Sequence, residues 1–507
     1  MCEVKKSNDG ANYIYFLRQL FVTLTVAINI TGHGCIIGYA AILIMALRQP
    51  GSHIHATTNE ESWIASIVGF ALVVGNLIIT PLMDKLGRKR CHILTTLPVI
   101  TGWFILLLVK SVAGLIAARF LQGIAMGMLG PLGSIIIAET TDPRYRGPLL
   151  ISVSLSLTVG VLFCHTLGAF VSWQECALIC SFVTFISLLM SIYNPESPPW
   201  LLAKGRQEEA REVFTWLRGS NDAQQEELEK MIIAQKLIRK SSVVDDNLPL
   251  SVKTKRFFRY LRQTLKKPEF FKPIIIMIFL YMMFQFAGIN VLSSYATDII
   301  KNVVGPEANA KLLMVMLDVE RLICNIIAVF LAKTLKRRTL LFTSGTICVL
   351  SYLGKASYVF LKQHDMLPFD HQAIPIFLIG LYMFSLTVGI SSIPFALAGE
   401  IFPMEYRGLG SGISIICGLS MNFFIAVKSF PVLSNTIGLP LTYCCYASVV
   451  VICMIVTWFM LPETKDKTLQ EIEEIFKGIS AKDKKSAEPL TGGHDEMLRR
   501  CSSHIMY

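Results

Sequence analysis

Three ionisable residues stand close together in a stretch that is otherwise free of charge. Asp318, Glu320 and Arg321 lie within the mostly apolar run 312–332. A carboxylate and a guanidinium three positions apart meet on one helix face, where they can bind a polar solute, exchange a proton or neutralise each other. The charge-free remainder, 322–332, has 11 residues, whereas a membrane-spanning helix needs about 20. The stretch therefore either does not span a membrane or holds charges at membrane depth for a purpose.

Long apolar blocks recur along the whole chain of 507 residues, of which 53% are hydrophobic and 16% charged. In soluble proteins about 25% of the residues are charged. The twelve blocks are 20–46, 62–83, 93–110, 113–138, 149–171, 176–194, 273–300, 311–333, 340–361, 374–399, 409–432 and 439–461. Most can span a bilayer with some tilt, and the period-two alternation of a β-barrel is absent. The sequence predicts an all-α membrane protein with twelve transmembrane helices.

Lysines and arginines gather in alternate loops between the blocks. These cations are Lys85, Arg88, Lys89, Arg90, Arg144, Arg146, Lys333, Lys336, Arg337 and Arg338. Loops rich in such residues face the cytoplasm, so both termini are expected to be cytoplasmic. The net charge of +11 then reflects topology and contact with anionic lipid. The expected partner is a lipid bilayer rather than nucleic acid.

The two halves of the chain repeat each other. ETTDPRYRG at 139–147 and EIFPMEYRG at 400–408 both place a glutamate seven residues before Arg-Gly. DKLGRKR pairs with KTLKRR, and PESP pairs with PET, in the same order. Three ordered pairs indicate a parallel internal repeat. The predicted organisation is an N-terminal segment at 1–19, a six-helix bundle at 20–194, a cytoplasmic linker at 195–272 with helices near 203–217 and 223–240, a second six-helix bundle at 273–461, and a cytoplasmic tail at 462–507.

Charged residues at the ends of the repeated helices form a candidate cytoplasmic gate. They are Asp84, Arg88, Glu139, Arg146, Glu400 and Arg407. A Glu–Arg pair is strong where water is excluded and weak where it is exposed. We therefore expect these residues to bridge the two bundles in one conformation and to separate in the other. Fixing the topology alone would explain the cations but not the repeated glutamates.

These motifs resemble the sugar porter family of the major facilitator superfamily over about residues 15–475. The matching segments are GRK at 87–89, Glu139 with Arg146-Gly147, PESPPWLL at 195–202, Gly288-Ile289-Asn290, EIFP at 400–403 with Arg407-Gly408, and PETK at 462–465. EESWIASIVGF at 60–70 is most similar to insect facilitated trehalose transporters. The resemblance implies two bundles that alternately expose a central site, a plasma-membrane location and a monomer.

The resemblance also implies where a substrate binds. Sugar hydroxyls suit amide side chains, which both donate and accept hydrogen bonds, inside a largely apolar and aromatic cavity. The implied substrate-binding residues are Gln285, Asn290, Tyr295, Asn422, Phe395 and Arg321. The amides would hold the substrate, the two aromatic residues would wall the cavity, and Arg321 falls where many sugar porters have an asparagine. Phe284 and Ser154 replace usual glutamines, so the site has lost some of its amides.

The charged stretch keeps three interpretations. Asp318 and Arg321 pair only with each other; or Arg321 lines the cavity as a donor to substrate; or Asp318 or Glu320 is a protonation site for coupled transport. Proton-coupled sugar porters have an aspartate where this chain has Ala40, which argues against coupling. His165, inside the fifth block, is expected to be a hydrogen-bonded packing residue rather than a proton relay.

The predicted function is a facilitative transporter, or uniporter, of a sugar such as glucose or trehalose. The alternatives are a carrier of a non-sugar or anionic metabolite, with or without proton coupling, and a nutrient sensor that does not transport. An enzyme is not expected, because no nucleotide-binding loop or nucleophile–base spacing is present. The 13 cysteines are scattered without metal-ligand spacing, so we expect small buried apolar residues, no metal and no cofactor.

Overall fold

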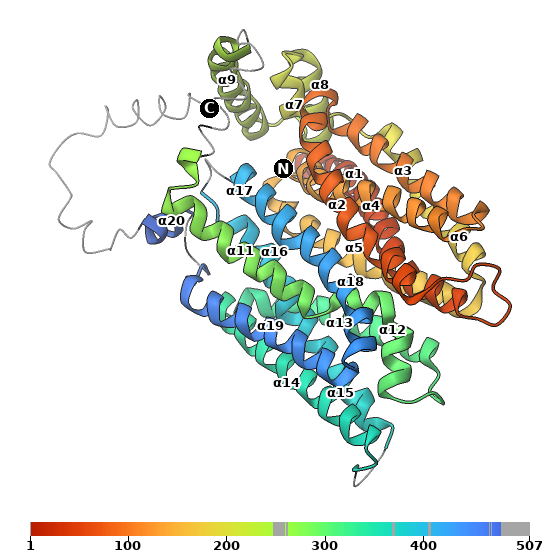
Figure 1. The fold of residues 1–507 in the computed structure, drawn as a ribbon. Coiled ribbons are helices and arrows are strands. Elements are labelled where there is room, and N and C mark those ends of the chain that lie inside the picture. The colour runs from red at the N-terminus through yellow and green to blue at the C-terminus, as the bar shows by residue number, and fades with distance from the viewer. Residues whose placement is uncertain are drawn as a thin grey trace, which may run out of the picture.

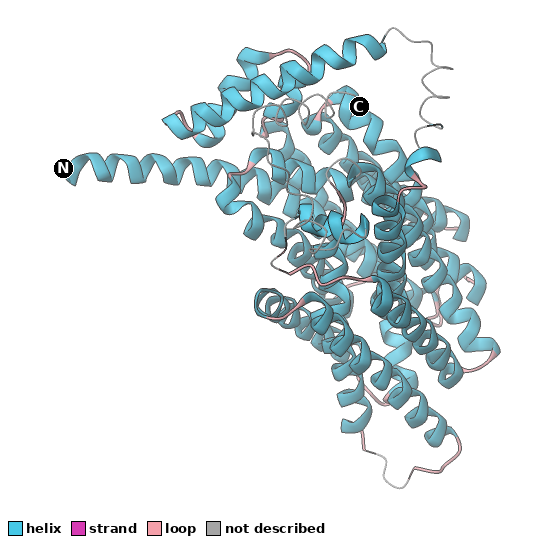
Figure 2. Cartoon of the chain, turned by 90° about the vertical axis from the view of Figure 1, so that its left-hand side faces the viewer, coloured by secondary structure: helices cyan, strands magenta, loops and turns pink. Residues whose placement is uncertain are grey.

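The fold is described here from a computed structural model, which covers residues 2–246, 259, 262–367, 371–403, 407–465, 467 and 469–477. For 2–12, 236–246, 407 and 469–470 the backbone alone is described. Throughout these residues the regular structure is helical, without strands (Figure 2). The first half holds α1 (Cys2–Leu47), α2 (Thr58–Leu86), α3 (Arg88–Leu108), α4 (Val112–Thr140), α5 (Pro143–Phe170) and α6 (Trp173–Tyr193).

Further helices follow the first half, before the second half begins (Figure 1). Those in the described residues are α7 (Pro198–Ala203), α8 (Gln207–Arg218) and α9 (Asp222–Asp246). The second half holds α11 (Pro268–Phe286), α12 (Ile289–Val303), α13 (Ala310–Thr334), α14 (Arg337–Gln363), α15 (Ala373–Ser385), η1 (Leu386–Ser391), α16 (Ser392–Glu400), α17 (Arg407–Ser414), η2 (Ile415–Ser420), α18 (Met421–Thr436) and α19 (Leu439–Met460), and α20 (Leu469–Lys477) comes last. Helices α8 and α9 confirm the two helices expected after the first half.

All twelve apolar blocks are helical, and ten helical stretches of the described residues are long and apolar enough to cross a membrane. Helices α13 and α14 are the two exceptions. They carry charged residues inside their apolar runs, including Arg321 and Lys355. Because lipid offers no hydrogen-bond partner to a bare backbone, apolar blocks of this length become helices.

Local sequence explains where several helices begin and end. Thr57 and Glu60 form a capping box at the start of α2, in which each side chain accepts a hydrogen bond from the other residue's backbone N–H. Ser172 and Glu175 do the same at the start of α6. Gly87 lies between α2 and α3 and has a φ of 90°. Because this conformation is strained for residues with a side chain, glycine suits the turn between the two helices.

Three second-half helices are interrupted rather than continuous. The chain leaves α11 and enters α12 through Gly288, which has a φ of 90°. The six-residue segments η1 and η2 are π-helical, a geometry that inserts a residue and is frequent at functional sites. The interruptions place irregular backbone within the second half, where protein rather than lipid can satisfy it.

The two halves meet where α1 packs against α12, α2 against η2 and α18, and α5 against α13. We call the bundle end that adjoins α7–α9, and that carries the α2–α3, α4–α5 and α13–α14 connections, the linker end. The far end is the opposite one, which carries the α1–α2, α5–α6 and α12–α13 connections.

Candidate functional site

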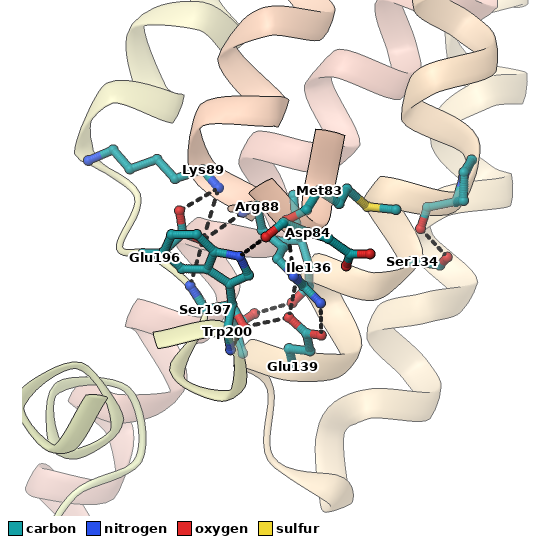
Figure 3. A network of polar contacts seen from close by, with 12 residues as sticks. Met83, Asp84, Arg88, Lys89, Ser134, Ile136, Glu139, Glu196, Ser197 and Trp200 are labelled. Atoms are coloured by element: carbon teal, nitrogen blue, oxygen red, sulfur yellow. Dashed lines mark hydrogen bonds and ion pairs between the residues drawn. The ribbon is translucent and has the colours of Figure 1, made fainter. Parts of the chain in front are cut away.

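A network of ion pairs and hydrogen bonds lies at the linker end of the first half (Figure 3). The Arg88 guanidinium on α3 donates to both oxygens of Glu139 on α4, at 2.9 and 2.8 Å. The Ser197 hydroxyl also donates to Glu139. The carboxylate of Glu196 accepts from the backbone N–H groups of Arg88 at 2.7 Å and Lys89 at 3.2 Å. Glu196 thus satisfies free donors at the positive N-terminus of α3.

The second half repeats this network with different residues. Arg337 on α14 donates to Glu400 on α16 at 3.1 Å, and the Thr464 hydroxyl donates to Glu400 at 2.7 Å. The Glu463 carboxylate accepts from the backbone N–H groups of Arg337 at 3.0 Å and Arg338 at 3.2 Å. The sequence repeat is therefore also a repeat of hydrogen bonds.

Both networks join helices of the same half, so the expected bridge between bundles is not what this structure shows. The reason is geometric: each glutamate faces an arginine from its own half. Sequence reasoning also missed four partners, Glu196, Ser197, Glu463 and Thr464. The signal for them was the PESP and PET pair, in which a glutamate is followed by a hydroxyl residue at matching positions.

The remaining gate candidates lie apart from these pairs. The Asp84 side chain is exposed and its carbonyl accepts from the Trp200 indole at 3.1 Å, so it contributes its backbone rather than its charge. Arg146 donates to the carbonyl of Thr141 at 3.4 Å, within its own half. The side chain of Arg407 lies outside the described part of the chain.

The three candidate amides gather around the break between α11 and α12. Asn290 donates to the side-chain oxygen of Gln285 at 2.7 Å, and Gln285 donates to the Leu419 carbonyl of η2 at 3.1 Å. Asn422 donates to the carbonyl of Gly418, the η2 residue just before Leu419, at 2.7 Å. All three amides are buried. The π-helical turn thus supplies adjacent acceptors that hold two amides from different helices.

The two aromatic candidates differ in exposure. Phe395 on α16 is 51% exposed and packs edge-on against Phe284, with ring centroids 5.6 Å apart. Tyr295 is 3% exposed, stacks on Phe430 at 5.8 Å and donates to the Val427 carbonyl at 3.3 Å. The Phe395 ring is therefore half exposed, whereas Tyr295 lies inside the second half.

The charged stretch of α13 does not form the internal pair that was one interpretation. Asp318 contacts His165 Nδ1 of the first half at 2.5 Å, and His165 Nε2 lies 3.1 Å from the Gly38 carbonyl. Arg321 donates to the Ser293 hydroxyl of α12 at 3.2 Å. His165 is hydrogen-bonded as expected, but its contact also links the two halves.

Two further ionisable residues lie within helices of the second half. Glu320 faces Gly380 of α15, away from Asp318. Lys355 on α14 is 2% exposed, and sequence reasoning missed it. Its ammonium lies 3.4, 4.5 and 4.9 Å from the ring centroids of Tyr382, Tyr352 and Tyr443 respectively. The signal was a single lysine inside the apolar block 340–361.

Three buried cysteines of the first half come together although their spacing suggested no cluster. The sulfurs of Cys164, Cys176 and Cys180 lie within 4.8 Å of one another. The cysteines pack as small buried side chains, with 3.8 Å between the sulfurs of Cys164 and Cys176.

Two cations at the far end make polar contacts between the halves. Arg48, just after α1, binds Glu61 at 2.5 Å and Asp298 of α12 at 2.8 Å. The hydrogen bond with Glu61 raises the pKa of Arg48 above its ordinary value, so this guanidinium stays charged. Lys428 of α18 donates to the side chains of Asn59 at 2.8 Å and Ser62 at 2.7 Å. Both cations thus link the halves.

The helix order, the two repeated halves and the broken second-half helices define a major facilitator carrier. Solved structures of the xylose transporter XylE share this fold: an inward-open form from E. coli aligns with a TM-score of 0.69 at 18% identity, over 91% of this chain and 99% of that one. The proton:xylose symporter XylE bound to 6-bromo-6-deoxy-D-glucose gives 0.66 at 18% identity, over 92% and 99%.

The chain belongs to the family described as "Sugar (and other) transporter", which matches residues 30–476. It is also similar to the facilitated trehalose transporter Tret1 of Bombyx mori, with 26% identity over 92% of this chain and 90% of that protein. The Tret1 protein of Apis mellifera ligustica is 25% identical, over 94% and 90%. The family confirms a multi-pass membrane carrier rather than an enzyme.

Proposed function

We propose that this protein is a uniporter, which carries a sugar such as glucose or trehalose across the plasma membrane by alternating access. In this proposal the linker end and both termini face the cytoplasm, because the lysine- and arginine-rich loops lie there. The protein works as a monomer without a cofactor, and its gradient-driven flow needs no second solute.

The observation that carries the proposal is where the halves are bonded to each other. Within the described residues, the hydrogen bonds and ion pairs between the halves lie at the far end or near mid-depth. Those at mid-depth join Asn325 with Thr158 at 2.8 Å and Asn76 with Ser420 at 3.4 Å. This pattern supports a state closed toward the outside, with the cytoplasmic ends free to separate.

The second half supplies the substrate-binding groups in this proposal. Gln285 and Asn290 are bonded to each other, so a sugar hydroxyl meets a donor and an acceptor already oriented. Asn422 bonds to the same π-helical segment, η2, that holds Gln285, and the exposed ring of Phe395 offers an apolar wall for the sugar face.

The first experiment measures uptake of radiolabelled glucose, trehalose and a small organic anion into proteoliposomes, with and without a pH gradient. Saturable sugar uptake that does not respond to the gradient supports the uniporter. Asn290→Ala is expected to raise KM for the sugar about tenfold, since a buried polar partner is lost. The exposed Asn302 on the same helix provides the control, because Asn302→Ala should leave KM unchanged.

A second candidate, an anion carrier, is favoured by one observation. The Nε of Arg321 is buried and has no hydrogen-bond partner in the structure, so this guanidinium retains a donor for an anionic group. Arg321→Asn separates the two proposals. A sugar carrier should retain or gain sugar uptake, whereas an anion carrier should lose its uptake of the organic anion.

A further inference from the structure

The break between α11 and α12 leaves carbonyl groups that the helix does not use. Gln285 precedes it, Phe286 and Ala287 form its turn, Gly288 has a φ of 90°, and Asn290 follows. Carbonyls freed by a break inside a membrane must find other donors, because lipid has none. The geometry of this turn also sets the distance between the Gln285 and Asn290 side chains.

Two tyrosines from neighbouring helices supply the missing donors. The Tyr352 hydroxyl of α14 lies 3.2 Å from the Phe286 carbonyl and 2.9 Å from the Ala287 carbonyl. The Tyr382 hydroxyl of α15 also donates to Ala287, and the two hydroxyls lie 3.1 Å apart. A Cβ at Gly288 would come within 2.5 Å of both hydroxyls, so the turn fits closely against them.

Lys355 lies against the rings of the same two tyrosines. No described residue forms a hydrogen bond or ion pair with its ammonium group, so its three aromatic neighbours are its partners. A cation within about 6 Å of a ring centroid is attracted to the ring face, and the closest of these distances is 3.4 Å, to Tyr382. The Lys355 amine packs against both rings and, when protonated, draws electron density from their hydroxyls, which makes these better donors.

The surrounding space excludes a direct role for Lys355 in binding sugar. The cavity lined by Gly288, Lys355, Tyr382 and Tyr443 has a volume of about 10 Å³. That is room for about one water molecule, and far too little for a hexose. Lys355 therefore acts through the residues that it touches.

We propose that Lys355, Tyr352 and Tyr382 are positioning residues, which fix the α11–α12 break and thereby orient Gln285 and Asn290 toward substrate. This inference rests on the proposed function for its substrate, but the hydroxyl–carbonyl clasp is a property of the fold. The clasp acts on sugar affinity and on the local stability of the turn, rather than on overall stability.

The test compares matched phenylalanine variants. Tyr382→Phe and Tyr352→Phe keep the rings and remove the hydroxyl donors, so KM for sugar should rise about threefold to tenfold in each, from the loss of one or two hydrogen bonds. Tyr443→Phe is the control, because the Tyr443 hydroxyl is buried without a partner. Its KM should equal that of the wild type, and Tm should be similar in all three variants.

The lysine is tested by charge. Lys355→Met removes the cation at similar length and should raise KM to the same extent, whereas Lys355→Arg keeps a cation that can stack on the rings and should restore most of the affinity. Equal KM values in Lys355→Met and the wild type would overturn the role of the cation.

A readout without substrate separates this inference from the proposed function. Amide hydrogen exchange at the N–H groups of Ala287 to Asn290 should be faster in Tyr382→Phe and unchanged in Tyr443→Phe. If exchange behaves in this way but the wild type takes up no sugar, the clasp stands and the proposed function fails. If exchange and KM are both unchanged in Tyr382→Phe and Tyr352→Phe, the clasp is wrong.

Discussion

The two ends of the bundle use the same kinds of charged contact for different purposes. At the linker end, Arg88 with Glu139 and Arg337 with Glu400 each join helices of one half. At the far end, Arg48 with Asp298 joins one half to the other. The linker-end contacts are repeated in both halves, as expected for features that belong to the architecture of a half. A contact between unlike halves has two different partners and leaves no repeat in the sequence.

This comparison changes the meaning of the repeated glutamates. Under the proposed alternating access, we expect them to hold each half together as a rigid body, so they need not break during transport. The contacts expected to break are those at the far end, which the repeat does not reveal. Substitutions at the two ends should therefore differ in kind: the first should affect the integrity of a half, and the second the balance between conformations.

The largest effect is expected from Glu139→Gln. It removes the carboxylate that accepts two bonds from Arg88 and one from Ser197, in a pair whose side chains are 17% and 19% exposed. We expect the free energy of unfolding to fall by about 2–3 kcal/mol, measured as a lower Tm. Transport should be slower, with sugar binding largely intact.

Glu400→Gln sharpens the comparison within the linker end. Glu400 accepts one bond from Arg337 and one from Thr464, fewer than Glu139 does, and its side chain is 30% exposed, so its loss should lower Tm less than Glu139→Gln does. Loss of binding without a turnover defect in Glu139→Gln would contradict the structural role of this network.

An intermediate effect is expected from Asp318→Asn, which keeps the shape but removes the charge from the contact with His165. Because this contact joins the halves and both residues are buried, its weakening should favour the outward-open state by about 1–3 kcal/mol. Spin-label distances across the far end would measure the change. An unchanged distance distribution would show that the contact does not govern opening.

The smallest effect is expected from Arg48→Ala. The Arg48 side chain is 43% exposed, and exposed ion pairs contribute about 0.2–1 kcal/mol. The same far-end distances should shift slightly toward the open state, with little change in Tm. Added salt should reproduce this shift in the wild type and have less effect in the variant. A large loss of Tm would instead assign Arg48 to the stability of one half.

The helices were predictable because a single physical rule dominates them. In lipid, an apolar block of sufficient length must satisfy its backbone internally and becomes a helix, so hydropathy located all twelve blocks. The interruptions were not predictable from hydropathy, since the segment Leu386–Ser391 is as apolar as its flanks and still adopts a π-helical turn. Packing against other helices decides that geometry.

The candidate site was predictable by residue type but not by partner. The amides at 285, 290 and 422 were named from the family resemblance, and the structure brings them together around η2. The contact between His165 and Asp318 spans 153 positions, and no local pattern indicates it. Lys355 was overlooked because one lysine barely lowers the average hydropathy of its block, although an intramembrane charge is costly enough to need a structural reason.

The charges of α13 and α14 also have a consequence for biosynthesis. Each charge near the centre of a lone helix costs about 2.5–3.5 kcal/mol on insertion, and these two helices are separated by only Leu335 and Lys336. They are therefore expected to enter the bilayer together as a hairpin. Asp318 can then contact His165 at once, because the helix of His165 is synthesised earlier. Lys355 can contact Tyr382 and Tyr443 only after their helices have been synthesised. The order of synthesis thus sets the order in which the buried charges are matched, and the second half completes its core only when α19 arrives.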